Sequence, residues 1–488
     1  MGTTLTKSTS SKSTYSTLCP QLRAIKSTTA VVQAARAAIV DPFNTDNVVE
    51  NPSFTKAREI AAGELISVTL HAHEVNGKWI ASSEWTLNVA PSLGDCELPA
   101  RKHYRHATRL GAIDAAVNAL VIEIESQLDE LVLEKKWAKE LASLREWTGK
   151  VHEEVSAADA AVLPLHNVTT IEIFAGTGVA SQAFRDQGAQ SKLIIEIDEH
   201  ALAVGQRAVK PAAVHRDIRD FNGQGMSTDV LIMGAVCTAH SKAGNSKGLK
   251  DDYVGPVHNA AMNAVRDIDF KVAIVECAGE LLSPQFKADA DIWRKAFMRR
   301  GCRVQHRIID AADFGVPQSR VRSIMIATRG NVIIDEILGF VFPKGQPREA
   351  KVEDILQPHV ADEQHLGQIE ASEVVWHTKK RRSRHGLNEL GRVGGMPHQG
   401  YRVYDPKSIG PTMTASGGGR APCTGAYYID GKVRGLTPRE ACRMQGLPEW
   451  FEHDPDTRRA LKQAGNALAY PLFQALGTQL ASVLKPRT

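Results

Sequence analysis

Three residues whose side chains can do covalent or acid–base chemistry each stand at the end of an apolar run. Cys237 follows "DVLIMGAV", Glu276 ends the run in "IVECAGE", and Glu196 ends a run beginning "SKLII". A cysteine in such a place is either a small buried hydrophobe or a nucleophile. A carboxylate there must be paired, solvated or used. If the runs are parallel strands, all three side chains meet at one edge of a sheet, which predicts a site.

A glycine turn stands early in the same part of the chain. The stretch "IEIFAGTGVASQAF" runs from an apolar segment through Gly176 and Gly178 into a helical pattern, and Glu196 follows about twenty residues later. Small residues let backbone N–H groups approach a ligand, and an acid at that distance suits the two hydroxyls of a ribose. The spacing is not GxGxxG, so a nicotinamide cofactor is not favoured. A purely structural strand-to-helix turn is the alternative.

A third cluster lies in "FGVPQSRVRSIMIA", where Gln318, Arg320 and Arg322 alternate. On an extended segment these three side chains share a face. Arginines so placed can hold a phosphate or a carboxylate by paired hydrogen bonds. The alternative is a salt-bridged surface strand.

The elements that position these residues are predicted from the same apolar runs. The runs at 169–176, 191–198, 229–235, 271–278 and 323–329 are typical of buried parallel strands, with room between them for crossover helices. The sequence therefore predicts an α/β fold, a doubly wound Rossmann-like domain over residues 165–330.

The flanking regions have a different texture. Residues 331–435 are rich in glycine, include the basic run "TKKRRSRH", and predict a small loop-rich second domain. Residues 436–488 are helical and are expected to return to the α/β domain. Residues 55–150 predict an N-terminal α+β module, a ββα unit with an Asn76-Gly77 hairpin turn and one long helix. That helix is expected to pack on the next domain, with self-association or partner contact as the alternative.

The N-terminal residues 1–54 and the overall composition limit the remaining possibilities. The tail is rich in Ser and Thr, has no acid before Asp41, and predicts disorder, although a transit peptide can look similar. The 488 residues carry a net charge of +4, which permits nucleic-acid binding without requiring it. No stretch is apolar enough to span a membrane. Seven scattered cysteines with no CxxC pair favour a reducing, cytoplasmic compartment.

Taken in order, these motifs resemble those of the DNA cytosine-5 methyltransferase family, from about Thr169 to Lys485. "IFAGTGVASQAF" resembles the cofactor loop, "GAVCTAHSKAGNSKGLKDD" the nucleophile loop and "VECAGE" the Glu-Asn-Val motif. "QSRVR" keeps the Gln-x-Arg-x-Arg pattern. "RGLTPREACRMQGLPEWF" and "QAGNALAYPL" resemble the motifs that follow the target-recognition region.

The resemblance implies a cofactor, a substrate and a role for each motif. The cofactor is S-adenosylmethionine, and the substrate is a cytosine flipped out of double-stranded DNA, because its ring is unreachable within the stack. Residues 331–435 become the target-recognition domain. The implied cofactor-binding residues are Phe174, Gly176, Gly178, Glu196, Asp217 and Asn466. The implied DNA-binding residues are Gln318, Ser241, Lys379, Lys380, Arg381, Arg382, Arg384 and Gly418, although a charge run is often only a solvated face.

The chemistry needs these residue types. A thiolate at Cys237 adds to C6 of cytosine and leaves electron density at C5. A protonated Glu276 at N3 absorbs the developing charge, provided that burial raises its pKa. Arg320 and Arg322 position the cytosine carbonyl, the sugar-phosphate or the loop. Either water or a side chain then removes the C5 proton.

The sequence also departs from the family pattern around this chemistry. Val236, Thr238 and His240 replace the usual proline, glutamine and phenylalanine, Cys277-Ala278 replace Asn-Val, and Tyr253 stands where arginine is common. Four readings stay open. The protein is an ordinary DNA methyltransferase, an enzyme that acts on an already modified cytosine or another pyrimidine or transfers a different group, an enzyme for RNA cytosine, or a DNA-binding protein with little activity. The recognised sequence and any restriction partner cannot be inferred from these motifs.

Overall fold

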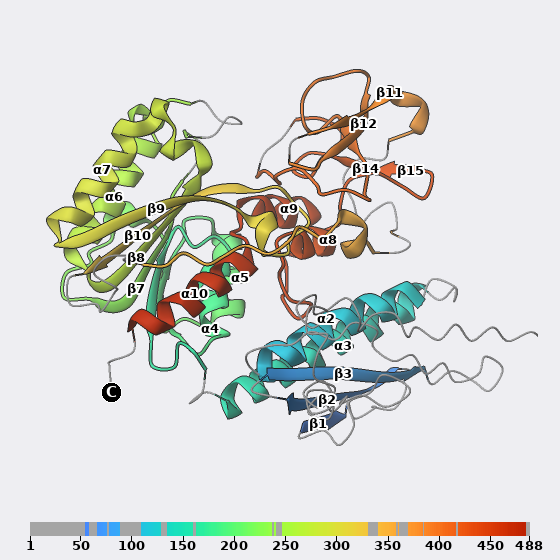
Figure 1. Ribbon diagram of the computed structural model, residues 1–488, viewed down its shortest axis with the longest axis horizontal. Helices are drawn as coiled ribbons and strands as arrows, with labels where there is room; N and C mark the ends of the chain where they lie inside the picture. The colour runs from blue at the N-terminus through green and yellow to red at the C-terminus, as the bar shows by residue number, and fades with distance from the viewer. Residues whose placement is uncertain are drawn as a thin grey trace, which may run out of the picture.

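The computed structural model describes residues 54–57, 66–75, 78–87, 109–127, 134–159, 163–236, 239–240, 246–329, 340–357, 360, 369–383, 385–415 and 418–484. The predicted tail 1–54 lies outside these residues except for Phe54. Figure 1 shows three parts: a sheet covered by helices on both faces, a second domain built around β11 to β15, and an N-terminal module in which helices α2 and α3 lie beside strands β1 to β3.

The central sheet has seven strands in the order β6-β5-β4-β7-β8-β10-β9. Its first five strands are parallel, and the order reverses between β4 and β7, as in a doubly wound fold. The predicted fold class is therefore confirmed. The strands are β4 (Thr169–Ile173), β5 (Gln190–Ile195), β6 (Ala213–His215), β7 (Ser227–Gly234), β8 (Asp269–Ala278), β9 (Cys302–Asp310) and β10 (Val321–Arg329).

Alternate residues of each buried strand face opposite layers of helices. Val230 and Ile232 pack in the core under one layer, whereas Leu231 and Met233 pack in the core under the other. This is why the strands read as continuous apolar runs rather than as alternating ones. The first layer contains α4 (Val179–Arg185) and α5 (Glu199–Val209); the second contains α6 (Val254–Asp267) and α7 (Lys287–Arg299).

Three features of this sheet differ from the prediction. The run at 323–329 forms β10, which is antiparallel to both β8 and β9, because an apolar run carries no information about strand direction. Strand β9 was not predicted, since its middle is exposed and polar and gives no apolar run. Strand β6 was not predicted either, because it has only three residues.

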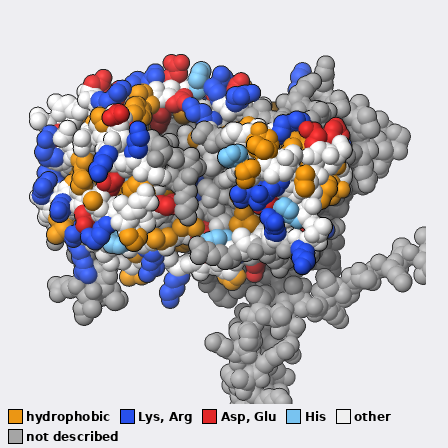
Figure 2. All heavy atoms as spheres, turned by 90° about the horizontal axis from the view of Figure 1, so that it is seen from above, with side chains coloured by type: hydrophobic (Ala, Val, Ile, Leu, Met, Phe, Trp, Pro, Cys, Tyr) orange, Lys and Arg blue, Asp and Glu red, His pale blue; other side chains and the backbone are white. Residues whose placement is uncertain are grey.

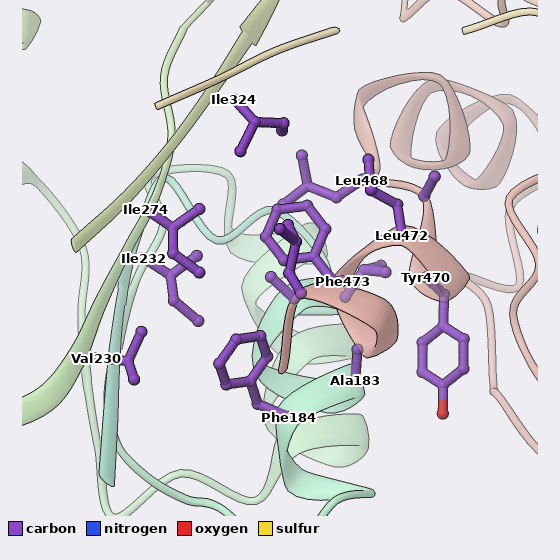
Figure 3. Close-up of a cluster of buried hydrophobic side chains, with 14 of the residues drawn as sticks. Ala183, Phe184, Val230, Ile232, Ile274, Ile324, Leu468, Tyr470, Leu472 and Phe473 are labelled. Carbon is purple, nitrogen blue, oxygen red and sulfur yellow. The ribbon is translucent and has the colours of Figure 1, made fainter. Parts of the chain in front are cut away.

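The C-terminal helices are α8 (Pro438–Met444), α9 (Thr457–Asn466) and α10 (Tyr470–Leu484). Helix α10 returns to the seven-stranded sheet, where Leu472 and Phe473 pack with Phe184 of α4 and Ile232 of β7 (Figure 3). Helices α8 and α9 instead share a core with the second domain. As predicted for 436–488, α10 packs on the α/β domain. Helix α8 also contributes Cys442 to the core of that domain, and the carbonyl of Gly465 in α9 accepts from Arg320, so α8 and α9 contact both domains.

The second domain contains a five-stranded sheet in the order β11-β12-β13-β14-β15. Tyr427 of β14 is fully buried and packs with Met444 of α8 and Leu461 of α9. The second domain is therefore joined to α8 and α9 by a common core. Its strands are β11 (Val374–Arg382), β12 (Asn388–Val393), β13 (Arg402–Tyr404), β14 (Ala426–Ile429) and β15 (Lys432–Arg434).

The N-terminal module has three strands and two helices among its described residues. Val75 pairs with Lys78, so residues 76 and 77 connect β2 and β3 as the hairpin signal predicts. The single long helix is wrong: α2 and α3 are separate helices, and no glycine or proline between them marks the break. The elements are β1 (Phe54–Ala57), β2 (Ile66–Val75), β3 (Lys78–Leu87), α2 (Arg109–Gln127) and α3 (Glu134–Ala158).

Helix α3 packs on the catalytic domain through a buried histidine, which confirms the preferred prediction for this region. His152 lies between Asp114 of α2, at 2.8 Å, and Asp186 at the end of α4, at 3.1 Å. Burial opposes a charge on this ring, but the two carboxylates outweigh it and raise the pKa of His152 to about 10. A second contact joins Arg145 to Glu449, 3.3 Å apart. The module is thus attached by charged groups that are out of water.

Membrane insertion has no support in the part of the chain that the structure covers, where no helix has the length and apolar character needed to cross a bilayer.

Candidate active site

A cavity of about 850 Å³ lies at the carboxyl ends of the parallel strands. The ends of β4, β5, β7 and β8 contribute Phe174, Glu196, Gly234 and Glu276 to its lining. Residues 319–322, 411–415 and 465–468 line its other sides. Ligands of open α/β sheets bind at this edge, so the cavity is the candidate active site.

The turn from β4 to α4 forms one wall of the cavity. Phe174 and Gly176 both line it and both have left-handed backbone, with φ of 60° and 56°. A Cβ on Gly176 would meet no atom within 4 Å, so the glycine supplies the backbone angle rather than relief from a clash. Its N–H donates to the Glu196 carboxylate at 2.8 Å. The turn thus presents backbone to the cavity, as the sequence predicts.

Gly178 has a different role from the one predicted. It does not line the cavity and instead precedes α4 with φ of 72°. A Cβ there would lie 2.5 Å from a methyl group of Val209 and 3.5 Å from the Cα of Gly205. Gly178 therefore allows α4 and α5 to approach each other closely, a packing role that the sequence did not predict, and its role as a cofactor contact stays a prediction. Glycine patterns do not distinguish close helix packing from ligand contact.

Glu196 is held at the end of β5 by two backbone donors. Its two oxygens accept from the N–H of Gly176 and of Asp198, each at 2.8 Å. Burial raises the pKa of this carboxyl, and the two N–H donors oppose the rise. Each carboxylate oxygen keeps a second lone pair, which can accept from a hydroxyl in the cavity. This arrangement suits a ribose diol.

Asp217 and Asn466 both line the cavity. Hydrogen bonds from Arg219 Nε, at 2.9 and 3.0 Å, hold the Asp217 carboxylate, and this guanidinium lowers the pKa of Asp217 to about 2. Asp217 is therefore an ionised acceptor at neutral pH. Asn466 is the last residue of α9 and is exposed. Near it Lys462 forms an ion pair with Asp198 at 3.1 Å, a contact that sequence reasoning missed.

Glu276 and Arg322 form an ion pair at the cavity. Arg322 Nε lies 2.8 Å from Glu276 Oε1, and their side chains are 12% and 8% exposed. They meet because β8 and β10 are neighbouring antiparallel strands in which Arg322 pairs with Ala278, two residues beyond Glu276. The arginine fixes the direction of the carboxyl group, which the sequence placed at this edge without identifying its partner.

Gln318 and Arg320 lie together on one face of an extended segment, but their environment is protein. Gln318 is fully buried and donates to the carbonyl of Met444 at 2.6 Å, so its side chain faces protein in this structure, and its contact with DNA stays a prediction. Arg320 lines the cavity, yet its buried guanidinium donates hydrogen bonds to three backbone carbonyls, because the C-terminal segment packs against this face. The acceptors are Met413 at 3.0 Å, Gly465 at 3.2 Å and Ala467 at 2.7 Å.

The predicted nucleophile lies outside the described residues. Cys237, Thr238 and Ser241 all fall in this category. Val236, the residue before Cys237, lines the cavity. The chain is therefore at the cavity immediately before the cysteine.

Sequence reasoning missed a buried polar cluster behind this loop. His258 of α6 is fully buried, with Nε2 3.1 Å from the carbonyl of Val236 and Nδ1 3.3 Å from Trp293 Nε1. Burial, assisted by the nearby His240, lowers the pKa of His258 to about 4. His240 contacts Asp289 at 2.9 Å. The one available signal was a histidine on the apolar face of the 254–267 helix.

The residues predicted to contact DNA are only partly described. Lys379 and Arg381 are exposed on β11, and Gly418 is exposed in the turn near Gly400. The side chains of Lys380 and Arg382, and all of Arg384, lie outside the described residues. His385 and Leu387, which follow the basic run, line the cavity. On the face shown in Figure 2, Lys and Arg side chains are spread among apolar and acidic ones rather than gathered in one patch.

Comparison with known proteins agrees with this geometry. The sequence model of the family described as C-5 cytosine-specific DNA methylase matches residues 168–482. Type II methyltransferase M.HhaI of Haemophilus parahaemolyticus is 29% identical over 317 residues, covering 64% of this chain and 94% of that protein. Type II methyltransferase M.Bsp6I of Bacillus sp. (strain RFL6) is 26% identical over 321 residues, covering 63% and 96%.

Among solved structures, S. pombe Dnmt2 methyltransferase has a TM-score of 0.49 and 16% sequence identity to this chain, covering 65% of it and 99% of that protein.

Proposed function

Because the chain belongs to the C-5 cytosine-specific DNA methylase family, we propose that it transfers a methyl group from S-adenosylmethionine to C5 of a cytosine flipped out of double-stranded DNA. The chain is a DNA cytosine-5 methyltransferase by family. The cofactor, the covalent mechanism and the role of each residue are the proposal. The pairing of Glu276 with Arg322 beside the Glu196 turn, in one cavity, is the observation that carries it.

The residues of the cavity fit the cofactor. When bound, S-adenosylmethionine supplies a methyl group activated on a sulfonium sulfur. Glu196 has lone pairs directed to accept from the ribose, and Asp217 is an ionised acceptor that can bind an amino group of adenine. Phe174 offers a ring at the same wall, and the Gly176 turn leaves open space beside it. Asn466 approaches from the C-terminal segment.

Cys237 is the proposed nucleophile. Its thiolate forms a bond to C6 of cytosine, and the electrons of the C5–C6 double bond make C5 nucleophilic enough to take the methyl group. The methyl donor is left as a neutral thioether. Transfer of the C5 proton to water or to a side-chain base then restores the double bond, the S–C6 bond breaks, and the thiolate is regenerated. The base must leave the helix for this step, because C6 is covered by its neighbours in the stack.

Glu276 stabilises the ring while the adduct exists. A carboxyl group at N3 can share or donate a proton as negative charge develops on the pyrimidine. Arg322 keeps this carboxyl group in one orientation through the 2.8 Å contact. Arg320 holds the segments that carry Met413 and Ala467 at the cavity, so we assign it a positioning role.

DNA recognition is assigned to the second domain. The basic run on β11 supplies phosphate contacts, and exposed Lys379 and Arg381 are the described members of that run. Gly418 lies in the loop assigned to the displaced base. Because the run is followed directly by cavity residues His385 and Leu387, DNA held there has its strand next to the cavity.

The test measures transfer of labelled methyl groups and trapping of a covalent adduct. Wild-type protein should methylate duplex DNA in the presence of S-adenosylmethionine, and duplex containing 5-fluorocytosine should become covalently attached. Cys237→Ser should lose both activities, by about 10⁴-fold or more as expected for removal of a nucleophile.

Cys302→Ser is the matched control. Cys302 is a buried cysteine that pairs with Arg329, at the end of β10 that is farthest from Arg322. It should therefore retain full activity. Methylation of RNA in place of duplex DNA would overturn the substrate assignment, and wild-type speed in Cys237→Ser would overturn the mechanism.

A further inference from the structure

We infer that His258 and Asp289 are positioning residues that hold the two ends of the loop carrying Cys237. The inference rests on the proposed role of that cysteine as nucleophile. Both residues lie behind the cavity, on α6 and α7, and neither is among its lining residues.

His258 holds the first end through a hydrogen bond of defined direction. The indole of Trp293 can only donate, so the Nδ1 of His258, 3.3 Å away, must be the acceptor. The proton of the neutral ring is then on Nε2, which donates to the carbonyl of Val236 at 3.1 Å. Trp293 thus fixes the tautomer that His258 needs to bind the residue directly before Cys237.

Asp289 holds the second end. One carboxylate oxygen, Oδ2, accepts from the N–H of Leu249 and from Nε2 of His240, both at 2.9 Å. The chain is also closed at this point by a bond from the N–H of Gly248 to the carbonyl of Ala239, at 2.9 Å. A Cβ on Gly248 would lie 2.2 Å from the same oxygen, so the close approach of Asp289 requires glycine there.

The two anchors belong to one buried assembly. The rings of His240 and His258 stack with centroids 5.6 Å apart, and both side chains are fully buried. Burying polar groups costs free energy that apolar side chains of similar size would not cost. In exchange these groups fix backbone positions at residues 236, 240 and 249. A loop fixed at both ends confines the reacting atom, and misplacement by about 1 Å can slow a reaction by about 100-fold.

The experiment compares variants that remove or keep each hydrogen bond. His258→Phe keeps an aromatic ring but removes both ring nitrogens, while His258→Gln keeps one donor and one acceptor. Asp289→Leu removes the carboxylate acceptor, while Asp289→Asn keeps an acceptor oxygen. Phe297→Leu is the control, because Phe297 is equally buried, packs on Trp293 at 6.2 Å, and forms no part of the anchors.

We expect His258→Phe and Asp289→Leu to lower kcat for methyl transfer by about 10- to 100-fold, with the KM for S-adenosylmethionine unchanged. His258→Gln and Asp289→Asn should recover most of that rate, and Phe297→Leu should lose stability but not rate. Equal rates in wild type and His258→Phe, or an equal rate loss in Phe297→Leu, would overturn the inference.

Hydrogen exchange supplies a readout that does not depend on activity. The amides of Gly248 and Leu249 should exchange faster in His258→Phe and Asp289→Leu than in Phe297→Leu at the same stability. Unchanged protection of these amides would overturn the inference even in an inactive protein. If the Gly248 and Leu249 amides of the wild-type protein are protected as expected but the protein does not methylate DNA, only the proposed function is overturned.

Discussion

Two buried histidines differ in protonation state at neutral pH: His152 is positively charged and His258 is neutral. His152 joins the N-terminal module to the catalytic domain between two carboxylates, and its pKa is raised to about 10. His258 lies behind the cavity between a carbonyl and an indole N–H, and its pKa is lowered to about 4. Burial acts in the same direction on both rings. The partners therefore decide the charge.

The difference also separates two kinds of attachment. At the module interface, each ring nitrogen of His152 contacts a carboxylate, so the contact is an ion pair between structural units. Behind the cavity, one nitrogen of His258 must accept, so the ring must stay neutral to keep both bonds. A charged histidine donates from both ring nitrogens. A neutral histidine donates from one nitrogen and accepts at the other, so its partners specify which atom donates. The second kind suits a place where backbone direction matters.

The largest expected effect is at the module interface. His152→Phe leaves Asp114 and Asp186 buried without their shared cation, and removal of one partner from a buried ion pair costs about 3–5 kcal/mol. Urea unfolding should show this loss in the free energy of unfolding. Lys150→Ala, which removes an exposed pair with Glu146, should change stability by less than about 1 kcal/mol. Equal losses in the two variants would show that burial of the pair contributes nothing.

The pH dependence of stability should follow from the same histidine. Because the folded pKa of His152 is about 10 and its ordinary value is 6.5, its contribution is complete below pH 6.5 and is lost as the pH rises toward 10. The slope is at most about 1.4 kcal/mol per pH unit. Thermal unfolding of wild type and His152→Phe across this range should show the difference between them shrinking. Asp114→Asn removes one of the two carboxylates that raise the pKa of His152, so in that variant the contribution of His152 to stability should be lost at a lower pH.

An effect smaller than that at His152, and with the opposite pH dependence, is expected at His258. His258→Phe leaves the Val236 carbonyl and the Trp293 N–H without partners, which costs about 1–3 kcal/mol near neutral pH. Since the folded pKa of His258 is about 4, wild type loses stability through this group as the pH falls from 6.5 toward 4. The difference between wild type and variant should therefore narrow on acidification. A difference that widens would mean that the ring is charged in the folded protein.

The sequence predicted the arrangement around Gly176 and Glu196 better than the arrangement around Gln318 and Arg320. Gly176 and Glu196 are twenty residues apart and follow the ends of the neighbouring strands β4 and β5, so apolar runs and the strand-edge rule were enough to bring them together. Arg320 finds its acceptors 93 to 147 residues away, and the partner of Gln318 at Met444 is 126 residues away. Spacing within one segment indicated their shared face but not what covers it.

The same limit applies to the histidines. His152 and its two carboxylates are 38 and 34 residues apart in sequence, without any periodic relation. His258 stands on an apolar helix face, where its polar atoms look like an error unless Trp293 and Val236 are known to lie against them. Strand β9 was missed for a simpler reason, since its exposed middle has neither strict alternation nor a continuous apolar run.

The guanidinium of Arg320 limits how the recognition region could be exchanged for another. It donates to the carbonyl of Met413 and also to the carbonyls of Gly465 and Ala467 in the C-terminal segment. Nearby, the backbone of Gly410 forms hydrogen bonds with residues 317 and 319. Residues 410–413 thus belong with the catalytic framework although they lie inside the span of the recognition strands. A graft intended to change target specificity should replace the chain on either side of this segment and leave the segment itself intact.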